Sequence, residues 1–103
     1  MYLIGYMLEL SLLSPVKSIK LHQFPVIIGR GTNGDIVSLD DSSIGHYQCM
    51  IDRDIGGFMI WDLGTQVGTI INGQRINKNT PLQHGDKITI GDNSFTALIG
   101  VSP

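Results

Sequence analysis

The chain has 103 residues, a formal net charge of −2 and only 16% charged residues. This length suits a single domain, and 42% hydrophobic residues are enough to fill one core, which excludes a disordered segment. Seven lysine and arginine residues are spread along the chain and supply no basic face, which argues against a nucleic-acid binder.

Cysteine usage and the N-terminal residues bear on location. Cys49 is the only cysteine, so the chain cannot form an internal disulfide, and we expect a cytoplasmic protein. The neighbours of Cys49 are typical of a strand, which favours a small core residue over a reactive thiol. The apolar start, residues 1–13, lacks a basic segment and is interrupted by Glu9. It predicts a core strand, and neither a signal peptide nor a membrane span.

The first half of the chain predicts short strands separated by turns. Residues 2–12 are apolar with alternating polar positions near their end, which is strand periodicity. Pro25 favours an edge position or a strand start. We expect strands at 2–12, 16–21, 24–28, 36–39 and 46–52.

The second half continues the same pattern. Residues 58–63 are apolar on both faces, so we expect a central strand with Trp61 in the core. Asn72-Gly73 is a strong hairpin signal. No stretch keeps a helical period for ten residues, so we predict one domain over residues 1–103, an antiparallel β-sandwich of ten to eleven short strands. The further strands are expected at 69–71, from 75, 80–82, 87–90 and 94–99.

The stretch 29–46 holds the residues that suggest binding chemistry. It combines Arg30 with a glycine-rich turn and hydroxyl side chains. A planar guanidinium with several donors suits a phosphate or a carboxylate. We therefore expect a binding site on loops at one end of the sandwich.

Five short motifs resemble one known family when they are taken in order. The chain resembles the forkhead-associated (FHA) domain, a β-sandwich that binds phosphothreonine peptides, and the likeness is carried by residues 24–95. The similar motifs are Gly29-Arg30, Asp35-Ile36 with Ser43-x-x-His46, Trp61-x-Leu63, Gly68-Thr69 with Asn72-Gly73, and Gly85-Asp86-x-Ile88-x-Ile90-Gly91.

The resemblance implies roles for individual residues. Arg30 matches the arginine that contacts the phosphate, Ser43 matches the serine that hydrogen-bonds it, and Thr65 falls beside the phosphate. His46 matches a histidine that braces the binding loops and does no chemistry. Three further residues are expected to brace turns and loops: Gly68, Thr69 and Asn72.

Two positions depart from the family pattern. Ile44 follows Ser43 where the family commonly has an arginine or lysine, and Val67 replaces the asparagine that holds the peptide main chain. Neither side chain can form the hydrogen bond that is lost. Arg75 or Lys78 is a candidate for restoring positive charge near the phosphate.

The leading hypothesis is a signalling module that recognises a phosphothreonine-containing protein or peptide. The alternative is a degenerate FHA domain that binds a folded partner, or a second copy of itself, without phosphate. An enzyme is not expected, because no paired carboxylates, P-loop or dinucleotide fingerprint appear. His22 and His84 show no ligand spacing, so we expect neither a metal nor a cofactor, and no nucleic acid or membrane span.

Overall fold

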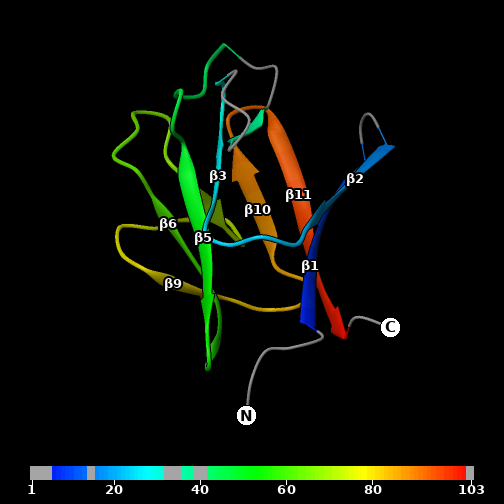
Figure 1. The fold of residues 1–103 in the computed structure, drawn as a ribbon. Helices are drawn as coiled ribbons and strands as arrows, with labels where there is room; N and C mark the ends of the chain where they lie inside the picture. The colour runs from blue at the N-terminus through cyan, green and yellow to red at the C-terminus, as the bar shows by residue number, and fades with distance from the viewer. Residues whose placement is uncertain (1–5, 14–15, 32–35, 39–41, 102–103) are drawn as a thin grey trace.

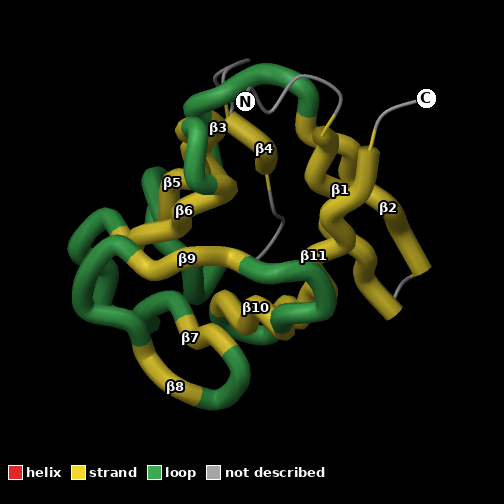
Figure 2. Tube along the Cα trace, turned by 90° about the horizontal axis from the view of Figure 1, so that it is seen from below, coloured by secondary structure: helices red, strands yellow, loops and turns green. Residues whose placement is uncertain are grey.

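The computed structural model describes residues 6–13, 16–31, 36–38 and 42–101, and it shows two packed β-sheets (Figures 1 and 2). The first sheet has the strand order β2-β1-β11-β10-β7-β8. Its strands are β1 (Tyr6–Leu13), β2 (Val16–Leu21), β7 (Ile70–Ile71), β8 (Gln74–Arg75), β10 (Lys87–Ile90) and β11 (Asn93–Val101).

The second sheet has the order β4-β3-β5-β6-β9. All described ladders are antiparallel except the one between β3 and β4, which is parallel. The strands of the second sheet are β3 (Val26–Gly29), β4 (Ile36–Ser38), β5 (Cys49–Asp54), β6 (Gly57–Asp62) and β9 (Thr80–Leu82).

The core lies between the two sheets because alternate residues of each strand point inward. Leu8 and Leu10 of β1 and the isoleucines of β10 meet the inward residues of β5 and β6. Cys49 is fully buried in this core, and burial, together with the Asp62 carboxylate, raises the pKa of its thiol to about 12. The prediction of an inert core cysteine is confirmed. In the described part of the chain, no helix is long and apolar enough to cross a membrane.

Most predicted strands match the observed ones, and β2, β9 and β10 have the expected bounds. Two predictions are wrong. The strand expected at 46–52 begins at Cys49, so residues 46–48 belong to the preceding loop. Trp61 is only half-buried and lies outside the core, because Phe58 and Ile60 are the inward residues of β6. The strand start after Pro25 is confirmed by β3.

Candidate functional site

Three segments meet at one end of the sandwich, next to the ends of β3, β5 and β6 (Figure 1). The Arg30 amide donates to the Gly45 carbonyl at 3.0 Å, which ties the end of β3 to the 42–48 loop. The Leu63 amide donates to the Gln48 carbonyl at 3.0 Å, which ties that loop to the segment after β6. The predicted cluster of loops at one end is therefore present.

Gln48 is a fully buried polar side chain that links the two loops. Its Oε1 accepts a hydrogen bond from the Gly45 amide at 3.0 Å. Its Nε2 donates to Thr65 Oγ1 and to the Gly68 carbonyl, both at 2.9 Å, and lies 3.4 Å from Asp62 Oδ1. Because a buried amide must be paired, this set of partners fixes the distance between the loops.

Asp62, the last residue of β6, organises the loop that follows it. Its Oδ2 accepts from the Gly64 and Thr65 amides at 2.9 and 2.8 Å, which is a turn typical of aspartate. Its Oδ1 accepts from the Thr65 and Thr69 hydroxyls at 2.7 and 2.9 Å. Partial burial acts to raise the pKa of Asp62, but these hydrogen bonds outweigh it and hold the pKa below its ordinary value.

The hydrogen bonds of Thr65 decide its role. Its hydroxyl donates to Asp62 and accepts from Gln48 and from the Gly68 amide at 3.1 Å. A hydroxyl has one proton and two lone pairs, so its capacity is filled. These hydrogen bonds give Thr65 a bracing role in the loop, and its place beside the phosphate stays a prediction.

Arg30 is exposed, and its backbone and guanidinium are both anchored on the 42–48 loop. Its Nε donates to the Ile44 carbonyl at 3.2 Å, which orients the plane of the guanidinium. Among the described residues, Arg30 forms hydrogen bonds through its backbone amide and its Nε. The two terminal nitrogens are the fork that binds phosphate or carboxylate bidentately.

Arg75 on β8 clamps the second loop from outside. Its Nη2 donates to the Thr65 and Gln66 carbonyls at 3.0 and 3.1 Å. Gly68 has a φ of +77°, and a Cβ there would lie 2.5 Å from Arg75 Nε, so only glycine fits beneath the guanidinium. Arg75 therefore contacts the second loop, but it lines, together with Lys78, a different cleft of about 500 Å³ next to β9.

Between the two loops lies a cleft of about 340 Å³, which we call the loop cleft. Ser43 is exposed on its wall, and Tyr47 and Leu63 are apolar residues with 55% and 36% of their surface exposed. The cleft thus combines a hydroxyl with apolar walls beside Arg30. Its lining residues are Ser43, Ile44, Gly45, Tyr47, Leu63, Gly64, Thr65, Gln66 and Val67.

The bracing role of His46 stays a prediction. His46 is exposed, and it is Gln48, two residues later, that braces the loops. Ile44 is 2% exposed in the core, so it does not occupy a cation position beside an anion. Ser43 and His46 have the family's Ser-x-x-His spacing, but the residue in the bracing position is Gln48, two residues after His46.

Counting three residues back from Gln48 places the family's serine position at Gly45 and its cation position at His46. Gly45 has no hydroxyl, so this position offers an anion only its backbone. A Cβ at Gly45 would lie 3.2 Å from Thr65 Cγ2 and 3.5 Å from the Tyr47 carbonyl, which is tight but open to a small side chain. His46 stands at the family's cation position and offers an imidazole N–H donor there.

The remaining predicted residues lie at different places. Thr69 is fully buried and donates to Asp62, so it braces the loop. Asn72, with a φ of +52°, holds the β7–β8 turn against Asp86 and the Lys87 amide at 2.9 Å each, away from the cleft. Val67 is half-buried, packs against the core and lines the cleft.

Sequence reasoning missed Gln48 and Asp62. The signal for Asp62 is its position before Gly64 and Thr65, which is typical of an aspartate-capped turn. Gln48 could have been found from Ile44, because this single apolar residue in a polar stretch indicates that the chain returns to the core just before Gln48. Among the described residues, no group of three or more His, Cys, Asp or Glu side chains could hold a metal ion.

Comparisons with known proteins agree with this geometry. The family model described as "FHA domain" matches residues 26–91. The FHA domain-containing protein At4g14490 of Arabidopsis thaliana is 28% identical over 72 residues, which cover 70% of this chain and 19% of that protein. The chain therefore spans about a fifth of the length of this curated relative.

Solved structures are similar over nearly the whole chain. Mycobacterium tuberculosis EmbR in complex with a low-affinity phosphopeptide has a TM-score of 0.84 and 28% identity, covering 94% of this chain and 25% of that one. The N-terminal FHA domain of S. cerevisiae Rad53p with a phosphothreonine peptide has a TM-score of 0.78 and 19% identity, covering 94% of each. The FhaA FHA domain complexed with the intracellular domain of Rv3910 has a TM-score of 0.74 and 24% identity, covering 89% of this chain and 98% of that one.

Proposed function

Because this chain belongs to the FHA domain family, we propose that it is a protein-interaction module that takes a phosphothreonine-containing segment of a partner into the loop cleft. The relatives support this choice, since EmbR and the Rad53p domain were both solved with phosphopeptides. The module acts by binding and needs no cofactor.

The observation that carries the proposal is the orientation of Arg30. Its Nε is held by the carbonyl of Ile44, a residue that lines the cleft, and the two walls of this cleft are already tied together by Gln48. A guanidinium held in this way loses little side-chain entropy when it binds a doubly charged phosphate. Arg30 is therefore the main phosphate ligand.

The rest of the cleft supplies weaker contacts. Ser43 lies on the wall and contributes a hydroxyl, and exposed His46 follows Gly45 on the same loop. Gly45 and Val67 offer no side-chain donor or acceptor to the peptide, and each missing hydrogen bond costs roughly 1–1.5 kcal/mol, or about tenfold in affinity. We therefore expect micromolar or weaker binding of short phosphopeptides.

The test is a titration of the ¹⁵N-labelled chain with a degenerate phosphothreonine peptide library, with the unphosphorylated library as its control. Saturable shifts of the Arg30, Ser43 and Gly45 amides with the phosphorylated library alone support the proposal. The Arg30→Ala variant must lose these shifts. Equal shifts with both libraries, or none up to millimolar peptide, overturn the role of phosphate.

A second function is favoured by three features of the same cleft. Gly45 has no hydroxyl, Thr65 has no free proton, and the walls at Tyr47 and Leu63 are apolar. These features suit a folded partner bound without phosphate, and the FhaA relative was solved with a protein domain as its partner. Partner capture that is unchanged in Arg30→Ala supports this second function.

The cytoplasmic location stays a prediction.

A further inference from the structure

The two outer faces of the sandwich differ in chemistry. In a two-layer sandwich, outward residues are ordinarily polar, because they face water. Most outward positions of β1, β2 and β11 follow this rule: Glu9 pairs across the ladder with Lys20, and Ser11 pairs with Ser18 and Thr96. The apolar exceptions among the described outward residues are Met7 and Leu98. The outer face of the first sheet is therefore mostly polar.

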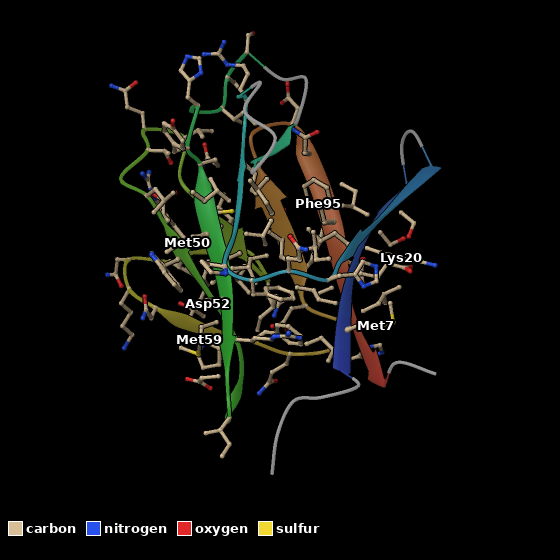
Figure 3. The ribbon with its side chains drawn as sticks, viewed as in Figure 1. Met7, Lys20, Met50, Asp52, Met59 and Phe95 are labelled. Atoms are coloured by element: carbon tan, nitrogen blue, oxygen red, sulfur yellow. The ribbon has the colours of Figure 1, made fainter. Side chains whose placement is uncertain are left out.

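The second sheet breaks the rule. The outward residues of β3, β5, β6 and β9 are half-buried or exposed and mostly apolar, and none of them belongs to the core or packs against it. Figure 3 shows Met50 and Met59 on β5 and β6, on the far side of the sheet from Phe95, which lies between the sheets. We call this surface the Met–Trp face, and its residues are Ile27, Met50, Met59, Trp61 and Pro81.

The strand register makes these residues one continuous surface. Ile27 lies opposite Met50, and Met50 lies opposite Trp61. Met59 lies opposite Pro81 and, on its other side, opposite Asp52. Four neighbouring strands separated by about 4.8 Å give a width of roughly 15 Å, which exceeds what one extended peptide can cover. A broad occupant is required, such as the surface of a folded domain.

The Met–Trp face is continuous with the loop cleft. Met59, Trp61 and Leu63 are alternate residues, so they follow one side of the chain, and Leu63 lines the cleft. Leu63 is about 13 Å along the chain from Met59, at about 3.3 Å per residue. A partner whose segment occupies the cleft is therefore within reach of Trp61 and Met59.

Asp52 discriminates between possible occupants. Its half-buried carboxylate lies beside Met59, and the adjacent cation, Arg53, extends over the Phe24 ring at 4.8 Å instead. A two-fold pairing of the face with itself would bring two copies of Asp52 into one desolvated contact, which is unfavourable. A different protein with a basic residue opposite Asp52 avoids this cost.

We propose that the partner is a folded protein that packs an apolar surface, with a basic residue at its margin, on the Met–Trp face while its phosphorylated segment enters the loop cleft. The proposal rests on the proposed function for the cleft half of the contact. Methionine adapts its shape to a partner, and tryptophan is a common centre of interface energy, so the side chains suit this role.

The partner is first identified by photo-crosslinking in the native cells. The probe is p-benzoylphenylalanine in place of exposed Pro81, and the control is the same probe in place of Thr96 on the polar outer face. A protein captured at position 81 and absent at position 96 is purified for the second step. If position 81 captures no such protein, the proposal is overturned.

The second step compares the intact partner with its excised phosphothreonine peptide. We expect the intact partner to bind at least about tenfold more tightly than the peptide. The double variant Met50→Ser/Met59→Ser must remove this higher affinity for the intact partner and leave the affinity for the peptide unchanged within twofold. The matched control is Leu98→Ser, which replaces a half-buried outward residue of the other sheet and must leave both affinities unchanged.

The proposal is overturned if the partner and the peptide bind with equal affinity, or if the double variant weakens both by the same factor. It is also overturned if sedimentation velocity shows that the chain self-associates and that the double variant abolishes this self-association. Failure of the proposed function looks different. In that case Arg30→Ala and phosphatase treatment leave partner binding intact, while the excess due to Met50 and Met59 is still present.

Discussion

The internal frame of the loop cleft and its ligand-facing side differ in how completely they are built. In the frame, Gln48, Asp62, Thr65 and Thr69 satisfy one another in a closed set of hydrogen bonds. On the ligand-facing side, Arg30 is anchored on the 42–48 loop by its Nε, whereas Gly45 and Val67 in the lining offer a ligand no side-chain donor or acceptor. The fold therefore keeps the loops in place, and the choice of ligand depends on few side chains.

The largest effect is expected from breaking the frame. In Gln48→Leu, the Gly45 amide and the Gly68 carbonyl lose their partner while they stay largely buried, so we expect the free energy of unfolding to fall by about 3 kcal/mol. Urea unfolding measures this loss. Gln48→His, which restores two ring nitrogens, is expected to lose less. The control Gln83→Leu changes an exposed glutamine and is expected to stay within about 0.5 kcal/mol.

A loss of similar size for Gln83→Leu and Gln48→Leu would show that the frame contributes no special stability. An unchanged stability of Gln48→Leu would contradict the bracing role directly.

The second effect is the pH dependence that Asp62 imposes on the frame. The pKa of Asp62 is lowered in the folded state, so its contribution to stability is present above the pKa of the unfolded carboxyl and is lost as pH falls through the lower folded pKa. We expect wild-type stability to decline below about pH 4. Asp62→Asn is expected to be about 2 kcal/mol less stable at pH 7 and to show a flatter decline.

Chemical denaturation between pH 2.5 and pH 7 measures this difference, with Asp54→Asn at the exposed β5–β6 turn as the control. Parallel stability curves for wild type and Asp62→Asn would contradict the role of the Asp62 carboxylate.

The smallest effect is expected from adding a ligand-facing group. Gly45→Ser places a hydroxyl at the position that the family pattern assigns to serine, and only Thr65 Cγ2 must shift by a few tenths of an ångström. We expect phosphopeptide affinity to rise about three- to tenfold, because one charge-assisted hydrogen bond is gained. Isothermal titration calorimetry measures the gain, and Ser43→Ala is the companion variant that removes a hydroxyl from the same wall. No gain in Gly45→Ser would show that Gly45 does not face the phosphate.

The fold was largely predictable because strand periodicity and turn residues act locally. Val16–Leu21 and Lys87–Ile90 have the bounds that their alternation predicts. Trp61 was misplaced because β6 is apolar on both faces, so alternation alone does not say which face is inward.

The site was less predictable because its bracing depends on contacts between distant segments. Ser43 and His46 have the spacing of the family motif, but the backbone pairing of Gln48 with Ile28 and Leu63 fixes which residue points inward. No local property of His46 reveals that it is exposed. Arg30 was identified correctly as a residue of the loop end, since its position after β3 is set by the strand itself.

The most direct test of the central claim is a two-by-two comparison of one library-selected peptide, with and without its phosphate, on wild type and Arg30→Ala. We predict that the phosphate improves binding to wild type at least about 30-fold, and that this factor falls below about threefold in Arg30→Ala. A phosphate-dependent gain that stays the same in the variant would contradict the assignment of Arg30 as the phosphate ligand.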